Sequence, residues 1–309
     1  MNKKLEKIVV YLVFILALIF LLQKTSLLFV RKGNGYGTDV LNFYKQENNS
    51  IDVLVLGSSH AYSAINPYLI EEETGLNAYN FCTQQQPVWI TYHYFKEALK
   101  TQNPQYVILE LFTVIDGEGD YAEESVNRDA IDKMRISLNK IETIRVSVDK
   151  KEDRIPYYFN IIKYHTRYKE LNATDFKTAF LGETLDNKGY IALPKTDYIF
   201  PEQKLRNDEK AEIYSKNLKY LNKIIDLAED NNMELILVKT PALYDEQSLA
   251  RLNTIKKIAE NKNIILLDYV NNMETLNLDY SNDFYDHGHL SGTGSDKFTK
   301  KLIEDLNLN

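Results

Sequence analysis

The sequence predicts an α/β protein: a three-layer α/β/α sandwich around a mainly parallel five-stranded sheet, preceded by one transmembrane helix. Two patterns lead to this prediction. A charge-free apolar run lies near the start of the chain, and short branched apolar runs then alternate with amphipathic helical stretches. Because strand–helix–strand units cross over right-handedly, this alternation favours a parallel sheet with helices on both faces.

The apolar run reads IVVYLVFILALIFLL over residues 8–22, and apolar character resumes up to residue 30. A bilayer needs roughly 20 residues, so the predicted span covers residues 8–30, with Lys24 reaching towards the interface. The lysines before the run favour a cytoplasmic N-terminus and an extracellular remainder; they are Lys3, Lys4 and Lys7. We therefore predict a signal anchor over residues 1–31 that holds the protein in the cell membrane.

Two other interpretations of this segment remain. A cleaved signal peptide would need a small-x-small cleavage site, and none follows the apolar run. A buried core helix is the other alternative. The lone cysteine, Cys82, excludes an intramolecular disulfide. The net charge of −7 disfavours a nucleic-acid groove, which needs clustered Lys and Arg.

The remaining elements follow in order. Residues 32–50 are polar and contain glycines, which predicts a linker, and the soluble domain is expected over 51–309. The predicted strands are 52–56, 78–81, 106–111, 234–238 and 264–267, and the predicted helices are 67–73, 87–100, 214–228, 248–259 and 295–306. Residues 118–208 lack this alternation and are predicted to form an insertion beside the sheet.

A first candidate site follows the first predicted strand, at Gly57-Ser58-Ser59-His60. Sites in parallel sheets lie at the carboxyl ends of strands, so the Ser59 hydroxyl is placed for chemistry. The alternative is that one of these serines simply caps the next helix.

A second candidate site is the loop at residues 283–292, which reads DFYDHGHLSG. A nucleophilic serine needs a base, and the base needs an acceptor that fixes its tautomer. His289 and Asp286 can supply both from one loop. Two alternatives are a solvated polar turn and a metal site, in which His287 and His289 join an aspartate of the loop and His60.

The two motifs in this order resemble the SGNH/GDSL hydrolase superfamily. The resemblance covers residues 50–116 and 210–307. It implies Ser59 as nucleophile, His289 as base and Asp286 as its orienting partner, with no cofactor.

Two segments depart from the family pattern. A glycine-bearing turn is expected after Asn80, but residues 81–85 read FCTQQ. The family often has an oxyanion asparagine a few residues beyond the third strand, where this chain has Phe112-Thr113-Val114. Losing one such donor typically costs ~10²–10³ in rate. The backbone amides of Ser59, Thr83 and Gln85 are then the expected oxyanion donors.

These departures, the anchor and the insertion are similar to one branch of the superfamily. Its members are exported partners of membrane-bound O-acyltransferases, such as D-alanyl-lipoteichoic acid transfer and polysaccharide O-acetylation proteins. The resemblance implies acyl transfer on a cell-envelope glycopolymer and a membrane-bound O-acyltransferase as partner. A pure esterase and a catalytically weak scaffold remain alternatives.

His60 and Arg167 are the candidate substrate-binding residues. His165-Thr166-Arg167 in the insertion resembles a segment of the same branch, and a guanidinium can hold an anionic substrate group. The alternative for Arg167 is an ordinary pair of charges on a helix surface.

Overall fold

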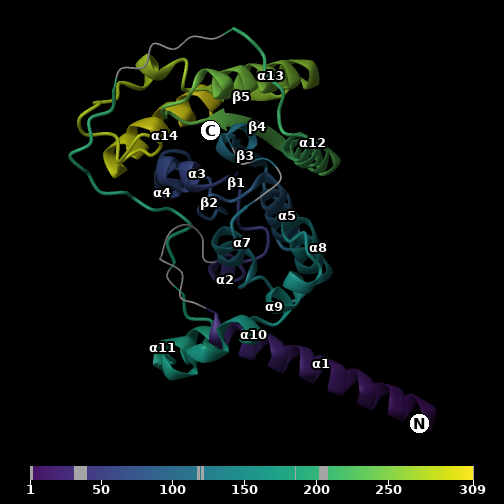
Figure 1. Cartoon of the computed structure of the whole chain (residues 1–309). Helices are drawn as coiled ribbons and strands as arrows, with labels where there is room; N and C mark the ends of the chain where they lie inside the picture. Colours follow the sequence, from purple (N-terminus) through teal and green to yellow (C-terminus); the bar gives the residue numbers. More distant parts are fainter. Residues whose placement is uncertain are drawn as a thin grey trace.

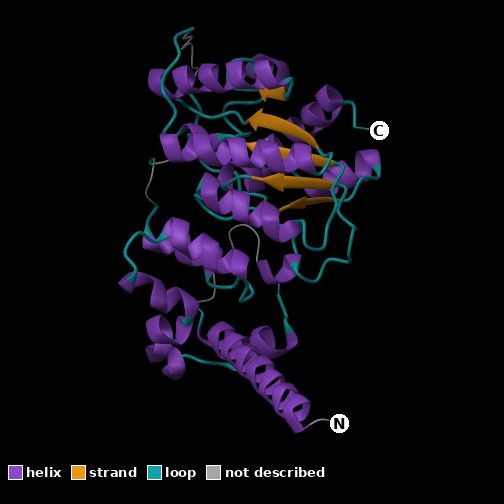
Figure 2. Ribbon diagram, turned by 90° about the vertical axis from the view of Figure 1, so that its right-hand side faces the viewer, coloured by secondary structure: helices purple, strands orange, loops and turns teal. Residues whose placement is uncertain are grey.

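A five-stranded parallel sheet forms the centre of the protein, whose computed structural model describes residues 3–30, 40–116, 119, 122–184, 186–201 and 208–308. The strands are β1 (Val53–Leu56), β2 (Ala78–Asn80), β3 (Tyr106–Glu110), β4 (Glu234–Lys239) and β5 (Ile265–Asp268). Their order is β2-β1-β3-β4-β5, and every neighbouring pair is parallel (Figures 1 and 2). The predicted α/β class with a parallel five-stranded sheet is confirmed.

Alternate residues of the strands enter two separate cores. In β1, Leu54 and Leu56 point to one core and Val53 and Val55 to the other, and all four are fully buried. A strand covered on both faces has no polar face, which explains why the sequence shows continuous apolar runs.

Helices cover both faces of the sheet. One face carries α5 (Val88–Ala98), α12 (Ser215–Asp230) and α13 (Glu246–Lys262). The other carries α3 (Ser59–Ala64), α4 (Pro67–Thr74) and α14 (Gly292–Leu306). The short helices α6 (Phe112–Ile115) and η4 (Met273–Leu276) follow β3 and β5. The layers are therefore α/β/α, as predicted.

The helix α1 (Lys3–Phe29) extends away from the domain (Figure 1). Among the described residues it is the one helix long and apolar enough to cross a membrane, and a signal sequence would have the same character. Its first three-quarters are exposed, whereas residues 22–30 are partly covered by other parts of the chain.

The predicted insertion is helical over residues 124–181, in two parts, and irregular over the described residues that follow, 182–184 and 186–201. The first part, α7 (Glu124–Ile131) and α8 (Leu138–Ser147), packs beside α5. The second part lies around the C-terminal end of α1, which we call its outer end because it is predicted to lie on the extracellular side (Figure 1). It comprises η1 (Glu152–Arg154), α9 (Ile155–Tyr158), α10 (Asn160–Tyr164), η2 (His165–Lys169), α11 (Ala173–Phe176) and the π-helix η3 (Lys177–Leu181). We call residues 155–181 the collar.

The predicted linker over 32–50 needs a correction. Residues 31–39 lie outside the described residues, but the short helix α2 (Val40–Phe43) packs into the core. Phe43 is 1% exposed and stacks on Phe81, with ring centroids 3.9 Å apart. The apolar positions Val40 and Phe43 are separated by one turn of helix, and this short pattern is hidden among polar neighbours. Residues 40–50 therefore belong to the domain.

Candidate active site

Ser59 stands at the carboxyl end of β1, where the strand order reverses between β1 and β3. Crevices form at such switch points. The turn into α3 is tight: a Cβ on Gly57 would lie 3.0 Å from the Cβ atoms of Ala61 and Glu110, and its φ of +150° favours glycine. Ser58 occupies the N-cap position without a side-chain bond, so Ser59 is the first residue of the helix.

The loop before α14 is fixed by its own hydrogen bonds. An isolated antiparallel bridge joins Phe284 to Leu290, and the Tyr285 amide donates to the His289 carbonyl at 2.9 Å. The Asp286 Oδ1 atom accepts from the amides of Gly288 at 2.8 Å and His289 at 2.9 Å. This compact turn holds the carboxylate and the imidazole in one orientation.

Packing between α3 and α14 brings the two distant segments together. The hydroxyls of Ser295 and Thr299 both donate to the carbonyl of Ala64, at 3.1 and 3.2 Å. The Thr299 hydroxyl also accepts from the amide of Asn66 at 2.9 Å. Ser59 opens α3 and His289 lies just before α14, so this contact sets their separation.

The three predicted catalytic side chains form a hydrogen-bonded chain. The Nε2 atom of His289 lies 2.9 Å from the Oγ atom of Ser59. Its Nδ1 atom lies 2.9 and 3.0 Å from the two carboxylate oxygens of Asp286. Ser59 is 6% exposed, and the side chains of His289 and Asp286 are 23% and 33% exposed. The three side chains thus lie within proton-transfer distance at the surface, in the arrangement that a nucleophile, a base and an orienting carboxylate require.

The carboxylate of Asp286 is held in its ionised form. Burial raises its pKa, but the hydrogen bonds from the His289 ring and from the Gly288 amide outweigh burial, so the net pKa lies below its usual value. An ionised carboxylate is what the orientation of His289 requires.

His60 lies behind the triad. It is 4% exposed, and its ring stacks on Phe112 with centroids 3.7 Å apart and lies 4.7 Å from the His289 ring. A Cβ on Gly288 would lie 3.0 Å from its Nε2 atom, so the loop that carries His289 packs directly on it. Burial and the nearby Lys239 hold the pKa of His60 well below its usual value. His60 therefore supports the His289 ring in its neutral form, and its substrate-binding role stays a prediction.

The predicted oxyanion donor Thr83 is already engaged. Its amide donates to the Oε1 atom of Gln86 at 3.1 Å, and its hydroxyl donates to the same atom at 3.0 Å. Gln85 is exposed and has a φ of +50°, a left-handed conformation that is uncommon outside glycine. The turn therefore has the backbone shape of a glycine turn without a glycine. The amides of Ser59 and Gln85 remain the candidates for an oxyanion hole.

Arg167 binds the end of α1 and also lines a cavity, so its substrate-binding role stays a prediction. Its guanidinium donates to the carbonyls of Phe29, at 2.9 Å, and Val30. It also pairs with the buried carboxylate of Asp175 at 3.0 Å. The last carbonyls of a helix have no partner within the helix, so a cation in this position caps it.

A buried ion pair beneath the site did not emerge from the sequence. The Nζ atom of Lys239 lies 2.6 Å from an oxygen of Glu110, and both residues are fully buried at the ends of neighbouring strands. The Glu110 carboxylate also accepts from the hydroxyl of Thr240 and the amide of Phe112. The sequence did hold a signal for this pair: the apolar runs of β3 and β4 end in residues of opposite charge.

The metal alternative finds no support in the geometry. Both ring nitrogens of His289 are engaged, by Ser59 and Asp286. Asp283 is 2% exposed and pairs with Lys297 at 2.6 Å, which ties the loop to α14. Within the described ranges, no three His, Cys, Asp or Glu side chains converge as a metal site would require.

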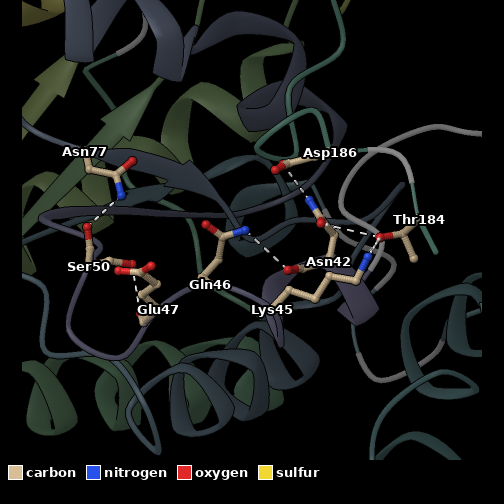
Figure 3. A pocket seen from close by; sticks show the side chains of 8 residues that line it. All are labelled: Asn42, Lys45, Gln46, Glu47, Ser50, Asn77, Thr184 and Asp186. Atoms are coloured by element: carbon tan, nitrogen blue, oxygen red, sulfur yellow. Dashed lines mark hydrogen bonds between the residues drawn. The ribbon is translucent and has the colours of Figure 1, made fainter. Parts of the chain in front are cut away.

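Two cavities lie away from the triad. One, of about 430 Å³, lies at the amino ends of the strands and is lined by α2 and polar side chains such as Asn77 and Asp186 (Figure 3). The other, of about 680 Å³, lies between the Gln84–Gln85 turn, α7, the collar and Val30. The second cavity extends from the turn at the carboxyl end of β2 to the C-terminal end of α1, at Val30.

No protein-family model matches the chain, and no curated protein matches it in sequence. Solved structures with a similar course of chain include a protein named as a lipolytic protein of the G-D-S-L family from Desulfitobacterium hafniense DCB-2. It is 12% identical, with 83% of this chain and 99% of that chain covered and a TM-score of 0.42.

A protein named as an acylhydrolase from Bacteroides fragilis NCTC 9343 is 12% identical, with 87% of this chain and 93% of that chain covered and a TM-score of 0.42. An acetyl xylan esterase from the rumen bacterium Butyrivibrio proteoclasticus is 14% identical, with 84% and 64% coverage and a TM-score of 0.34. These similarities are too distant to transfer an activity to this chain.

Proposed function

We propose that this protein is a membrane-anchored serine acyltransferase or esterase that acts outside the cytoplasm. Its substrates are O-acyl groups, acetyl or D-alanyl, of a cell-envelope polysaccharide or teichoic acid. The observation that carries the proposal is the continuous hydrogen-bonded chain from Ser59 through His289 to Asp286. Such a chain activates a hydroxyl for attack on an acyl carbonyl.

The first half-reaction makes an acyl-enzyme. His289 takes the proton of the Ser59 hydroxyl on Nε2 as the oxygen attacks the acyl carbon. The negative charge on the carbonyl oxygen is offset by the amides of Ser59 and Gln85, and Asp286 offsets the charge on the imidazolium. His289 then gives the proton to the departing alcohol oxygen, and the C–O bond to the alcohol breaks.

The second half-reaction releases the acyl group. A polymer hydroxyl or water loses its proton to His289 and attacks the acyl-enzyme, and the proton returns to Ser59 as that ester breaks. Attack by a polymer hydroxyl gives transfer, and attack by water gives hydrolysis. The cavity that runs from the Gln84–Gln85 turn to Val30 favours an acceptor that approaches from the membrane side. A membrane-bound O-acyltransferase is the proposed source of the acyl group.

A catalytically weak docking partner of such an acyltransferase is the second candidate. The engaged amide of Thr83 favours it, as does Phe112-Thr113-Val114 in place of an oxyanion asparagine. Under this hypothesis the triad geometry would be retained without useful turnover.

A fluorophosphonate probe tests the proposal on the full-length protein in detergent. We expect the wild type to be labelled and Ser59→Ala to remain unlabelled. Ser58→Ala is the matched control, because its hydroxyl is also buried and lies one residue away. Labelling of Ser59→Ala would contradict the proposal, and so would a wild type that is not labelled. An unlabelled wild type that still binds an acyltransferase would favour the docking partner.

A further inference from the structure

The exposed apolar part of α1 is too short to cross a bilayer. Its charge-free exposed stretch runs from Ile8 to Leu21. At ~1.5 Å per residue this stretch is about 21 Å long, whereas the hydrocarbon core is roughly 30 Å thick. If α1 spans the membrane, the remaining ~9 Å must come from the residues that follow Leu21. The collar covers those same residues.

The collar, together with Ile136 of the α7–α8 connection, satisfies the polar side chains of the segment that follows Leu21. Lys24 donates from Nζ to the carbonyl of Ala179 at 2.7 Å. Gln23 accepts from the amide of Ile136 at 3.3 Å, and Ser26 accepts from the amide of Asn160 at 3.4 Å. Arg167 caps the last carbonyls of the helix. Polar groups within hydrocarbon need internal partners of this kind, because no water is available to them.

The opposite side of the collar is apolar and uncovered. Leu181 is 69% exposed, Phe180 50% and Phe176 48%, all beside the end of α1. Exposed aromatic and branched side chains continue along α9, α10 and η2, namely Phe159, Ile162 and Tyr168. Lys163, Lys169 and Lys177 are interspersed among them, all with exposed side chains. Lys163 and Lys177 form exposed ion pairs, with Glu124 at 2.7 Å and Glu183 at 3.4 Å, which head groups can replace. Apolar side chains flanked by lysines are typical of segments that lie in a membrane interface.

We propose that the collar, residues 155–181, is a second membrane-binding element that lies in the outer interface of the bilayer beside α1. We choose the lipid bilayer as the partner because the collar packs on the residues that follow Leu21. These are the residues that α1 needs to complete a span of the hydrocarbon core. The lysines meet anionic head groups, and Phe176, Phe180 and Leu181 enter the acyl region. This inference rests on α1 being retained as a membrane span and not on the catalytic activity.

Site-directed fluorescence in vesicles tests the collar. Cys82 is fully buried, so an introduced cysteine can be labelled selectively with an environment-sensitive nitrobenzoxadiazole group, with the unmutated protein as labelling control. The full chain is labelled at Phe180→Cys, at Val13→Cys within α1, or at Ile265→Cys. Ile265 is 43% exposed on β5, at the far edge of the sheet from β2. Vesicles of phosphatidylglycerol and phosphatidylcholine carry lipid spin labels near the head group or near the chain end.

We expect the Phe180 probe to lose most of its fluorescence with the shallow spin label and less with the deep one. The Val13 probe should respond most to the deep label, and the Ile265 probe to neither. Quenching at Val13 with none at Phe180 would overturn the proposal while leaving the anchor intact. The proposal would likewise be overturned if the environment of the Phe180 probe changed only when a co-purified protein was bound. That result would favour a protein-docking face. No quenching at Val13 would remove the premise that α1 spans the membrane.

Discussion

The carboxylate of Asp286 accepts hydrogen bonds from two backbone amides as well as from the His289 ring. It therefore keeps its position even when the imidazole rotates. His289 is confined on its other side by His60, which stacks on Phe112. A base held on both sides needs little reorganisation before it accepts the serine proton.

Replacing Asp286 with Asn should lower kcat for ester cleavage by roughly 10⁴, because the amide cannot offset the imidazolium charge and favours the wrong tautomer. KM should change little. Steady-state hydrolysis of a small aryl acetate measures this effect. Asp296→Asn, which alters an exposed carboxylate on α14, is the control and should retain full activity. A loss of less than tenfold in Asp286→Asn would argue against an orienting role.

The sequence pointed to the residues of the triad but not to those around it. Ser59, His289 and Asp286 could be found because each sits in a short motif next to a predictable strand or helix end. The amide of Thr83 is taken by a side chain only three residues away, that of Gln86. The surroundings of His60 and Arg167 depend on long-range partners: His60 is covered by the loop at Gly288, and Arg167 meets the end of α1. No local pattern encodes these contacts.

At the scale of elements, α5 is joined to α8 of the insertion by buried polar contacts. The Nδ1 atom of His93 lies 2.8 Å from the amide oxygen of Asn139, and the Trp89 indole donates to Ser147 at 3.2 Å. Burial lowers the pKa of His93 from 6.5 to about 4, despite the Asn139 hydrogen bond. Burial outweighs the hydrogen bond, so the folded protein disfavours the protonated form of this histidine.

The stability of the protein should fall as pH drops from 6.5 to 4. In this window the unfolded chain binds a proton at His93 that the folded protein does not, so acidification favours unfolding by up to about 3 kcal/mol. His93→Gln should make this slope shallower. His60 adds a slope of the same sign, so some dependence will remain. Urea unfolding in detergent, followed by the fluorescence of the lone Trp89, measures it.

The exposed His165 provides the control, since its replacement by Gln leaves the α5–α8 contact intact. An unchanged pH slope in His93→Gln would show that this histidine does not couple protonation to folding.

Strands and long helices were predictable because their patterns are local and repeated. The apolar runs at 106–111 and 234–238 match β3 and β4 within a residue or so. The insertion was not predictable in detail, because its helices are short and are stabilised by α1 and α5 rather than by their own periodicity. The helix α2 was missed for the same reason: it is stabilised by packing into the core, where Phe43 stacks on Phe81, and not by a pattern of its own.

At the scale of the whole molecule, α1 is part of the fold of the collar. Removing residues 1–21 should leave this contact complete, and we expect that variant to be stable in detergent and fully labelled by the probe. Removing residues 1–30 takes away the carbonyl partners of Arg167 and the cover of the collar. Its melting temperature should fall by roughly 5–10 °C, as expected when a buried charge loses partners.

Differential scanning fluorimetry of the two truncated proteins and the full chain measures the difference. Equal melting temperatures for the two truncations would mean that the outer end of α1 contributes nothing to the stability of the domain.

Because the collar packs on residues 22–30, an α1 that spans a membrane would also set the height of Ser59 above the lipid surface. A domain on a flexible linker would sample a wide range of distances from the membrane, whereas this one would work within a thin layer parallel to it. Long glycopolymers would then be modified first on their membrane-proximal units, and units farther out would be reached only when the chain bends back. The spacing of acyl groups along such a polymer would record the geometry of the anchor.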